Sequence, residues 1–263
     1  MDINLFGKKA FVCGSTQGIG KAAAIELANS GASIVLLARN EDKLKEVKAE
    51  LNAAHNQRHD YIVADFSKPE DLQNKVTEYL EKNASPVHIL INNTGGPPGG
   101  KAVDAKLEEF IAAFQTHLIC NQILAQSLIG GMKAEKYGRI INVISTSFKQ
   151  PIPGLGVSNT IRGAVASWAK TLAGELGGFG ITVNNVLPGF TKTARLASII
   201  ENKANKSGDS VEKVEAEMQT ETPAKRFAEA SEVANAIAFL ASPAASYING
   251  INLPVDGGRT GCL

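Results

Sequence analysis

The chain has 263 residues, of which 44% are hydrophobic and 20% are charged, which suits one large α/β domain over residues 1–263 better than two small ones. Lys and Arg (27) balance Asp and Glu (26) to a formal charge of +1, so no basic field favours nucleic acid or an anionic membrane. No apolar run approaches the roughly 20 residues that span a bilayer, and the first residues lack a signal-peptide pattern. Composition therefore predicts a soluble cytoplasmic protein with a small-molecule or protein partner, and neither nucleic acid nor membrane as a partner.

Short apolar runs, most of them β-branched, alternate with longer amphipathic stretches along the chain. We expect strands at residues 10–13, 33–38, 61–64, 87–92, 139–145, 181–187 and 251–255, because continuous apolar runs suit strands buried on both faces. Helical patterns cover residues 20–30, 41–55, 69–83, 107–136, 159–176 and 232–242. This alternation predicts an α/β fold with a single Rossmann-type, doubly wound parallel sheet of about seven strands and helices on both faces.

One polar, charge-rich interval interrupts the alternation, at about residues 197–225. Its composition fits a mobile lid formed by a substrate-loop insertion, and it fits a solvated helix pair equally well.

A glycine-rich loop directly follows the first expected strand and opens the first helix. Gly14, Gly18 and Gly20 let the backbone turn tightly and approach a pyrophosphate at the helix N-terminus. Tight turns use the same residues, so the loop alone is weak evidence for a dinucleotide. The second strand ends at Arg39, without the acidic residue that would accept the ribose 2′-hydroxyl of NAD. Arg39 could pair with a 2′-phosphate, which favours NADP(H) over NAD(H), or it could be an ordinary surface arginine.

Further motifs follow the later strands in a fixed order: Asp65 after the third, Asn92-Asn93-Thr94-Gly95 after the fourth, Ser145 after the fifth, Pro188-Gly189-x-x-x-Thr193 after the sixth and Val255-Asp256-Gly257-Gly258 near the end. With the glycine-rich loop, this order resembles that of the short-chain dehydrogenase/reductases from end to end. Within that family the chain is most similar to the β-ketoacyl-carrier-protein reductases, which act on 3-oxoacyl thioesters.

The resemblance implies a set of cofactor contacts. Gly14, Ser15, Gly18, Ile19 and Gly20 would hold the pyrophosphate and adjoining ribose, and Asp65 and Phe66 would border the adenine. Asn92 would anchor the sheet beside the cofactor, and Pro188, Gly189 and Thr191 would cradle the nicotinamide end. The resemblance also suggests a homotetramer, or else a homodimer.

The family's catalytic asparagine, serine, tyrosine and lysine fall, by the same resemblance, on His117, Ser145, Ser158 and Arg162. A phenol beside a lysine is a workable acid near neutral pH, whereas a serine hydroxyl is far less acidic. Arg162 stays protonated, so it could stabilise an oxyanion with the two serines, or bind ribose, carboxylate or phosphate, but it relays no proton. His117 could supply the proton through water, or it could be a packed histidine without a chemical role.

Three functions are compatible with these residues. The first is an NADP(H)-dependent oxidoreductase acting on a carbonyl or alcohol, with an altered proton route. The second is a dinucleotide-binding sensor or partner subunit without redox turnover, and the third is non-redox chemistry on the same fold. The remaining histidines and the cysteines lack ligand spacing, so we expect no metal: His55, His59, His88, Cys13, Cys120 and Cys262.

Overall fold

The computed structural model describes residues 1–262. Its centre is a sheet of seven parallel strands in the order β3-β2-β1-β4-β5-β6-β7. The strands are β1 (Lys9–Cys13), β2 (Ser33–Ala38), β3 (Asp60–Val63), β4 (Ile89–Asn92), β5 (Gly138–Val143), β6 (Ile181–Pro188) and β7 (Asn252–Val255). The predicted fold class, a doubly wound Rossmann-type sheet, is confirmed.

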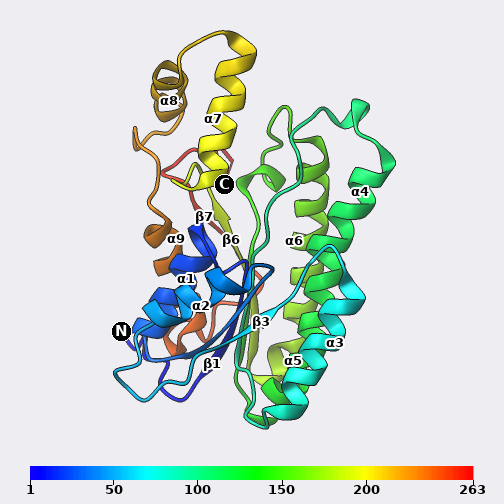
Figure 1. The fold of residues 1–263 in the computed structure, drawn as a ribbon, viewed down its shortest axis with the longest axis vertical. Helices are drawn as coiled ribbons and strands as arrows, with labels where there is room; N and C mark the ends of the chain where they lie inside the picture. Colours follow the sequence, from blue (N-terminus) through cyan, green and yellow to red (C-terminus); the bar gives the residue numbers. More distant parts are fainter. Residues whose placement is uncertain (263) are drawn as a thin grey trace.

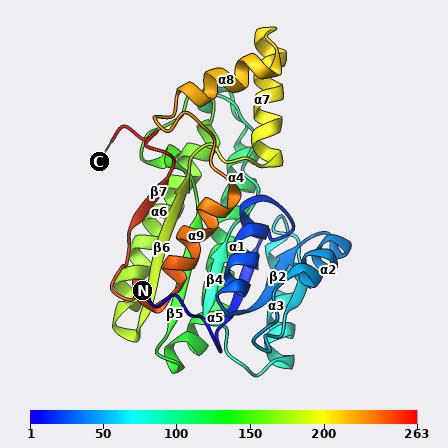
Figure 2. The same ribbon diagram turned by 90° about the vertical axis from the view of Figure 1, so that its left-hand side faces the viewer.

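Helices cover both faces of the sheet (Figure 1, Figure 2). One face carries α1 (Gly18–Asn29), α2 (Glu41–Glu50) and α9 (Ala230–Ala241), and the other carries α3 (Pro69–Lys82), α5 (Cys120–Ala134) and α6 (Gly156–Leu176). Short 3-10 turns η1 (Ala102–Asp104), η3 (Thr146–Phe148), η4 (Gly177–Phe179) and η5 (Pro243–Ala245) lie in the connections. Within residues 1–262, no helix has the length and apolar character needed to cross a bilayer.

The continuous apolar strands supply both cores at once. In β1, Ala10 and Val12 face the core under α1 and α9, while Phe11 and Cys13 face the core under α3, α5 and α6. All of these side chains are fully buried. The unbroken apolar run in the sequence therefore reflects burial on both faces, as in other parallel sheets with helices on each side.

Four asparagines form a ladder across the carboxyl half of the sheet. Asn92 Nδ2 donates to Asn142 Oδ1 at 2.8 Å, Asn142 Nδ2 to Asn185 Oδ1 at 2.9 Å, and Asn185 Nδ2 to Asn252 Oδ1 at 2.8 Å. These residues are direct partners in the strand register from β4 to β7. The ladder satisfies most of these amide groups, and it joins β4, β5, β6 and β7 by side chains as well as by the backbone.

The charge-rich interval noted in the sequence contains a helix pair beyond the end of β6, α7 (Ala194–Ser207) and α8 (Val211–Thr220) (Figure 1). Gly208, with a φ of +76°, makes the turn between them. Leu196, Ile200, Val214 and Met218 form an apolar cluster between the two helices and Phe227. The pair therefore has a small core of its own, apart from the two main cores.

The long helical pattern at residues 107–136 is interrupted. It consists of α4 (Leu107–Phe114), a π-helical segment at Gln115–Ile119 and α5. Short π segments inside α-helices are frequent at functional sites. This one carries His117.

Candidate active site

The glycine-rich loop is packed too tightly for side chains. A Cβ on Gly20 would lie 2.1 Å from the carbonyl oxygen of Gly14, and a Cβ on Gly14 would lie 2.6 Å from that of Asn93. Gly14 also has a φ of +58°, which L side chains rarely adopt. Asn93 Nδ2 supports the loop by donating to the carbonyl oxygens of Cys13, at 3.2 Å, and Gly14, at 3.4 Å. Sequence reasoning had given Asn93 no separate role.

The N-terminus of α1 has backbone donors without a side-chain acceptor. Its N-cap residue, Gln17, makes no capping hydrogen bond, whereas the side chain of Asn40 accepts from the Lys43 N–H at the start of α2. Ser15 is buried and donates to the carbonyl oxygen of Leu37, and Ile19 packs against the core. The free first-turn N–H groups and the absence of side chains at the glycines fit the pyrophosphate of a dinucleotide.

Arg39 is exposed at the end of β2 and lies near the candidate adenine residues. The pKa of Asp65 is lowered first by the hydrogen bond from the Ser67 N–H, and also by the positive charge of Arg39. Within residues 1–262, Arg39 takes part in no ion pair. Its guanidinium is therefore available to an external anion, and buried Phe66 lies next to Asp65 in the chain.

Asn92 lies in the amide ladder, where its Nδ2 is engaged with Asn142. Its Oδ1 is buried and has no hydrogen-bond partner. The structure thus gives Asn92 a place in the sheet beside the loop that follows β4, in keeping with the anchoring role that the resemblance implied.

His117 is buried, with 2% of its surface exposed. Its Nδ1 lies 2.7 Å from the hydroxyl oxygen of Thr94, the third residue of the motif that follows β4. Burial, and then the positive charge of Arg162, lower the pKa of His117 to about 2. The imidazole is therefore neutral at physiological pH, and it can take part in proton transfer only in that form.

Ser158 and Arg162 lie one helical turn apart in the first two turns of α6, so they share a face of the helix. Both are buried, Arg162 to 7% exposure. Arg162 Nη1 donates to the carbonyl oxygen of Val143 at 3.3 Å, while its Nε has no partner. Ser145 is the N-cap of η3, shortly after the end of β5, and its Oγ accepts from the Ser147 N–H at 3.1 Å. The π segment that carries His117 and the 3-10 turn η3 that Ser145 caps both pack against α6, which carries Ser158 and Arg162, so the structure gathers these candidates in one region.

Arg195, which is exposed in the first turn of α7, is a candidate site residue that the sequence alone does not predict. Its Nη2 donates to the carbonyl oxygen of Pro97 at 2.8 Å. The nearest atoms to a Cβ built on Gly96 would be Nη2 of Arg162 and Nη2 of Arg195, each at 4.0 Å. Burial, and then the charge of Arg195, lower the pKa of Arg162 to about 10. Two guanidinium groups therefore approach each other beside the loop that follows β4.

The loop after β6 carries the candidate nicotinamide contacts Pro188, Gly189 and Thr191. A Cβ on Gly189 would lie 2.7 Å from the Cα of Asp256, so this position needs glycine. Thr191 is buried and donates to the carbonyl oxygen of Gly189 at 3.2 Å. It also pairs with Ala228 in an isolated parallel bridge, which joins the loop to the segment between α8 and α9.

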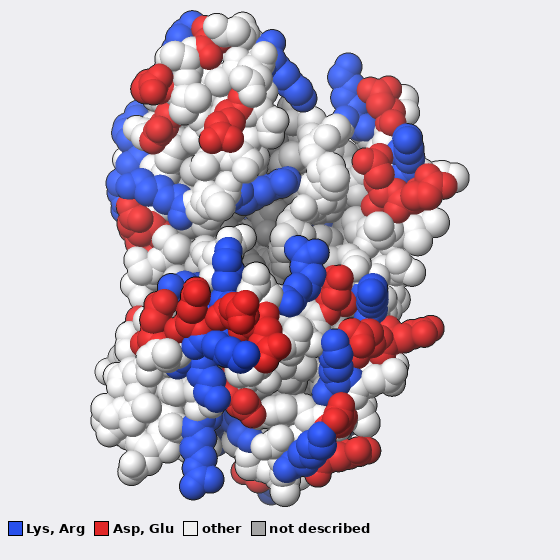
Figure 3. Space-filling view, viewed as in Figure 1, with Lys and Arg blue, Asp and Glu red and all other residues white. Residues whose placement is uncertain are grey.

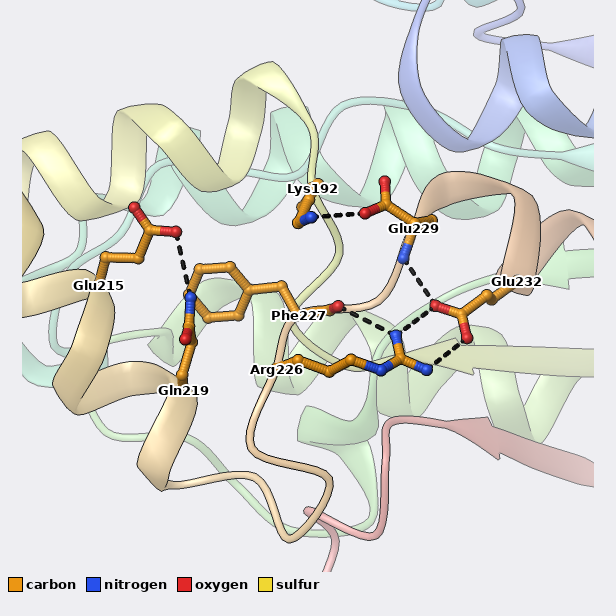
Figure 4. Close-up of polar contacts among 7 residues, drawn as sticks. All are labelled: Lys192, Glu215, Gln219, Arg226, Phe227, Glu229 and Glu232. Carbon is orange, nitrogen blue, oxygen red and sulfur yellow. Dashed lines mark hydrogen bonds and ion pairs between the residues drawn. The ribbon is translucent and has the colours of Figure 1, made fainter.

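Ion pairs hold that segment in place (Figure 4). Arg226 binds both carboxylate oxygens of Glu232, at 2.6 and 2.7 Å, and Lys192 binds Glu229 at 2.5 Å. Phe227 is buried against α7 and α8. The connection from α8 to α9 is therefore tied to the loop after β6, although exposed ion pairs contribute little energy one by one.

A hollow separates the α7–α8 pair from the side of the molecule that contains α4 and α6, and Lys and Arg side chains border it (Figure 3). Cavities of about 190 Å³, beside residues 150–153, and about 100 Å³, beside Phe190 and Asp256, lie near the loops after β5 and β6. Neither cavity is lined by Ser145, Ser158 or Arg162, so both flank the gathered candidates.

Comparisons with known proteins agree with this geometry. A family profile described as "Enoyl-(Acyl carrier protein) reductase" matches residues 14–260. The chain is 31% identical to the NADPH-dependent reductase BacG of Bacillus subtilis, over 95% of this chain and 97% of that protein. It is 32% identical to the 3-oxoacyl-[acyl-carrier-protein] reductase FabG of Haemophilus influenzae, over 96% of this chain and 98% of that protein.

A similar solved structure is that of L-sorbose reductase from Gluconobacter frateurii complexed with NADPH and L-sorbose. It has a TM-score of 0.93 and 31% identity, and the match covers 100% of both chains. The sheet, the glycine-rich loop and these full-length matches lead to one conclusion: the chain belongs to the short-chain dehydrogenase/reductases, a family of NAD(P)H-dependent oxidoreductases that act on small molecules.

Proposed function

We propose that the protein reduces a carbonyl group with NADPH, or oxidises the corresponding alcohol with NADP+, and that a buried guanidinium takes the place of the family's phenol and lysine. The observation that carries the proposal is Arg162. Only 7% of the surface of Arg162 is exposed, its Nε has no hydrogen-bond partner, and it shares a helix face with Ser158. A buried cation with an unused donor is suited to stabilise negative charge that develops on an oxygen.

The residues for the cofactor fit a dinucleotide. The loop Gly14–Gly20 and the uncapped start of α1 would hold the pyrophosphate, and Arg39 would bind the 2′-phosphate. Pro188, Gly189 and Thr191 would lie at the nicotinamide end. When bound, NADPH supplies the hydride.

Ser145, Ser158 and Arg162 would then orient and polarise the carbonyl oxygen. Their hydroxyl and N–H groups donate to that oxygen as it gains charge, and water is excluded by the burial of Ser158 and Arg162. For this role the serine hydroxyls do not need to ionise, and the guanidinium does not need to lose its proton. The substrate remains a proposal too, with 3-oxoacyl thioesters as one candidate because FabG, named as a 3-oxoacyl-[acyl-carrier-protein] reductase, is among the relatives.

The proton that the carbonyl oxygen gains during reduction would come from water and would pass through His117 and then the Thr94 hydroxyl. A neutral imidazole can release a proton from one ring nitrogen while the other accepts one, and the Thr94 hydroxyl lies 2.7 Å from Nδ1. This relay needs no imidazolium, which agrees with the lowered pKa of His117. The alternative is that His117 only supports the turn of helix at residues 115–119.

Titration of the purified protein with NADPH and with NADH, followed by cofactor fluorescence, tests the cofactor assignment. We expect NADPH to bind at least about tenfold more tightly, since a bidentate Arg–phosphate contact exceeds about 1.4 kcal/mol. Arg39→Asp should narrow or reverse this preference, whereas Arg58→Asp, at another exposed arginine, should not.

Each bound complex is then offered simple ketones and 3-oxoacyl thioesters while the absorbance of NADPH is followed. Oxidation of NADPH by any of them supports the proposal. Equal affinities for the two cofactors would contradict the role of Arg39, and tight NADPH binding without turnover would favour a non-redox sensor or partner subunit.

A further inference from the structure

Two arginine side chains from distant parts of the sequence meet beside the loop that follows β4. Arg162 comes from α6 and Arg195 from the start of α7. Their Nη2 atoms each lie 4.0 Å from the position of a Cβ on Gly96, so the two nitrogens are no more than twice that distance apart. Gly96 itself carries no side chain, and it leaves the space between the guanidinium groups open.

No carboxylate neutralises this pair. Within residues 1–262, neither Arg162 nor Arg195 forms an ion pair, and the only hydrogen bonds of their guanidinium groups go to the carbonyl oxygens of Val143 and Pro97. Arg162 Nε is buried and unpartnered. Burial, and then the positive charge of Arg195, lower the pKa of Arg162. Arg195 is exposed to water, but Arg162 is a buried cation without an ion-pair partner, which is unfavourable unless an anion joins it.

We infer that the Arg162–Arg195 pair is an anion subsite that binds a carboxylate of the substrate, next to the carbonyl group that is reduced. This inference rests on the proposed function, and it names the substrate class as small 2-oxo or 3-oxo acids, or the corresponding hydroxy acids, in place of 3-oxoacyl thioesters, which have no free carboxylate beside the carbonyl group. A carboxylate is planar, and it matches the fork of N–H donors that each guanidinium presents. Because Arg162 also faces the carbonyl oxygen in the proposed mechanism, the two groups of the substrate must be close in its skeleton.

A phosphate of the cofactor is the other source of an anion, and the positions of the side chains argue against it. The pyrophosphate is expected at the glycine-rich loop, where Thr193 lies: its Cγ2 is 3.1 Å from the position of a Cβ on Gly18. Arg195 reaches instead to Pro97, in the loop after β4. The start of α7 therefore directs Thr193 to the cofactor loop and Arg195 to the side where Arg162 and Ser158 lie.

Calorimetry separates these possibilities without relying on turnover. Acetoacetate and its neutral analogue methyl acetoacetate are titrated into the protein alone and into its complex with NADP+, in which no hydride can be transferred. We expect acetoacetate to bind at least about 30-fold more tightly than the ester, and Arg195→Met to remove most of that difference, as for the loss of one partner of a charged hydrogen-bonded pair. Lys206→Met removes an exposed positive charge from the same helix, and it should change the affinity less than about twofold.

Steady-state kinetics with NADPH provide the second measurement. In the parent protein kcat/KM should be higher for acetoacetate than for its methyl ester, and Arg195→Met should lower kcat/KM about 100-fold for the acid while it changes the value for the ester less than about threefold. Pyruvate and methyl pyruvate form a second matched pair with a shorter skeleton.

Three results would overturn the inference. The first is equal affinity for acid and ester in the parent, and the second is an Arg195→Met variant that binds acetoacetate as the parent does. The third is an Arg195→Met variant that loses affinity for NADP+ instead, which would assign the pair to a cofactor phosphate. If no carbonyl compound oxidises NADPH but acetoacetate still binds through Arg195, the proposed function fails and the anion subsite stands.

Discussion

At the scale of single residues, the candidate site contains polar groups whose pKa is changed by burial. His117 illustrates this, because an imidazole that would be half-protonated near pH 6.5 is held neutral by desolvation and by the charge of Arg162. The folded-state pKa of about 2 lies well below that of the unfolded chain. Between these two pH values the unfolded chain binds more protons, so His117 makes the folded state less stable as the pH falls below about 6.5.

His117→Asn should therefore reduce the acid sensitivity of the protein. We expect the parent to lose about 2 kcal/mol more of its free energy of unfolding than His117→Asn between pH 7.5 and pH 5. Urea unfolding followed by circular dichroism at both pH values measures this difference. His55→Asn, at an exposed histidine, is the control. An identical loss in the parent and in His117→Asn would show that the imidazole becomes protonated in the folded state.

The sequence predicts some candidate site residues and not others for a physical reason. Gly14, Gly18 and Arg39 are candidates from the sequence because the role proposed for them depends on their place in a local strand-turn-helix pattern. Arg195 was missed because its importance arises only where α7 meets Gly96 and Pro97, almost one hundred residues earlier in the chain. No local periodicity indicates that α7 approaches Gly96 and Pro97, and the charge composition of the α7 segment predicts only a solvated helix.

At the scale of elements, the four strands β4, β5, β6 and β7 are joined by side chains as well as by the backbone. Asn142 is the centre of the ladder, because it accepts from Asn92 and donates to Asn185 and is fully buried. Asn252, at the end of the ladder, only accepts from Asn185. Removing a central member leaves two buried partners unsatisfied, and removing the end member leaves one.

Asn142→Ala should therefore cost about 3 kcal/mol of the free energy of unfolding, and Asn252→Ala about 1 kcal/mol. Chemical denaturation of the two variants and the parent measures both values. Equal costs for the two positions would mean that the ladder does not act as a connected set of hydrogen bonds.

The strands and helices were predictable from the sequence where the buried residues follow the periodicity of the apolar residues. All of the expected strands are present, because runs such as residues 33–38 supply both cores. The helix expected at residues 41–55 ends at Glu50, since Leu51 adopts an extended conformation and is buried against the core. The π-helical segment at Gln115–Ile119 was not predicted, because it depends on how the helix packs and not on its apolar pattern.

At the scale of the whole molecule, the α7–α8 pair lies beyond the end of the sheet from which the connection after β6 emerges (Figure 1). Of the two alternatives for residues 197–225, a lid or a solvated helix pair, we propose the lid, with the α7–α8 pair closing over bound substrate. A second proposal concerns assembly: Leu107, Ile111 and Phe114 expose apolar side chains on α4, and such a patch suits a subunit contact of the homotetramer, or else homodimer, that the resemblance suggests. A monomeric mass in light scattering would contradict it.

The central claim is that Arg162 stabilises the carbonyl oxygen during hydride transfer. The most direct measurement is kcat/KM for the best carbonyl substrate at saturating NADPH in the parent and in Arg162→Met, with NADPH affinity determined for both. Methionine removes the buried charge and keeps much of the volume, so the variant should fold. We predict a loss of at least about 100-fold in kcat/KM, the size found when one donor to an oxyanion is removed. A variant that turns over as fast as the parent would contradict the account.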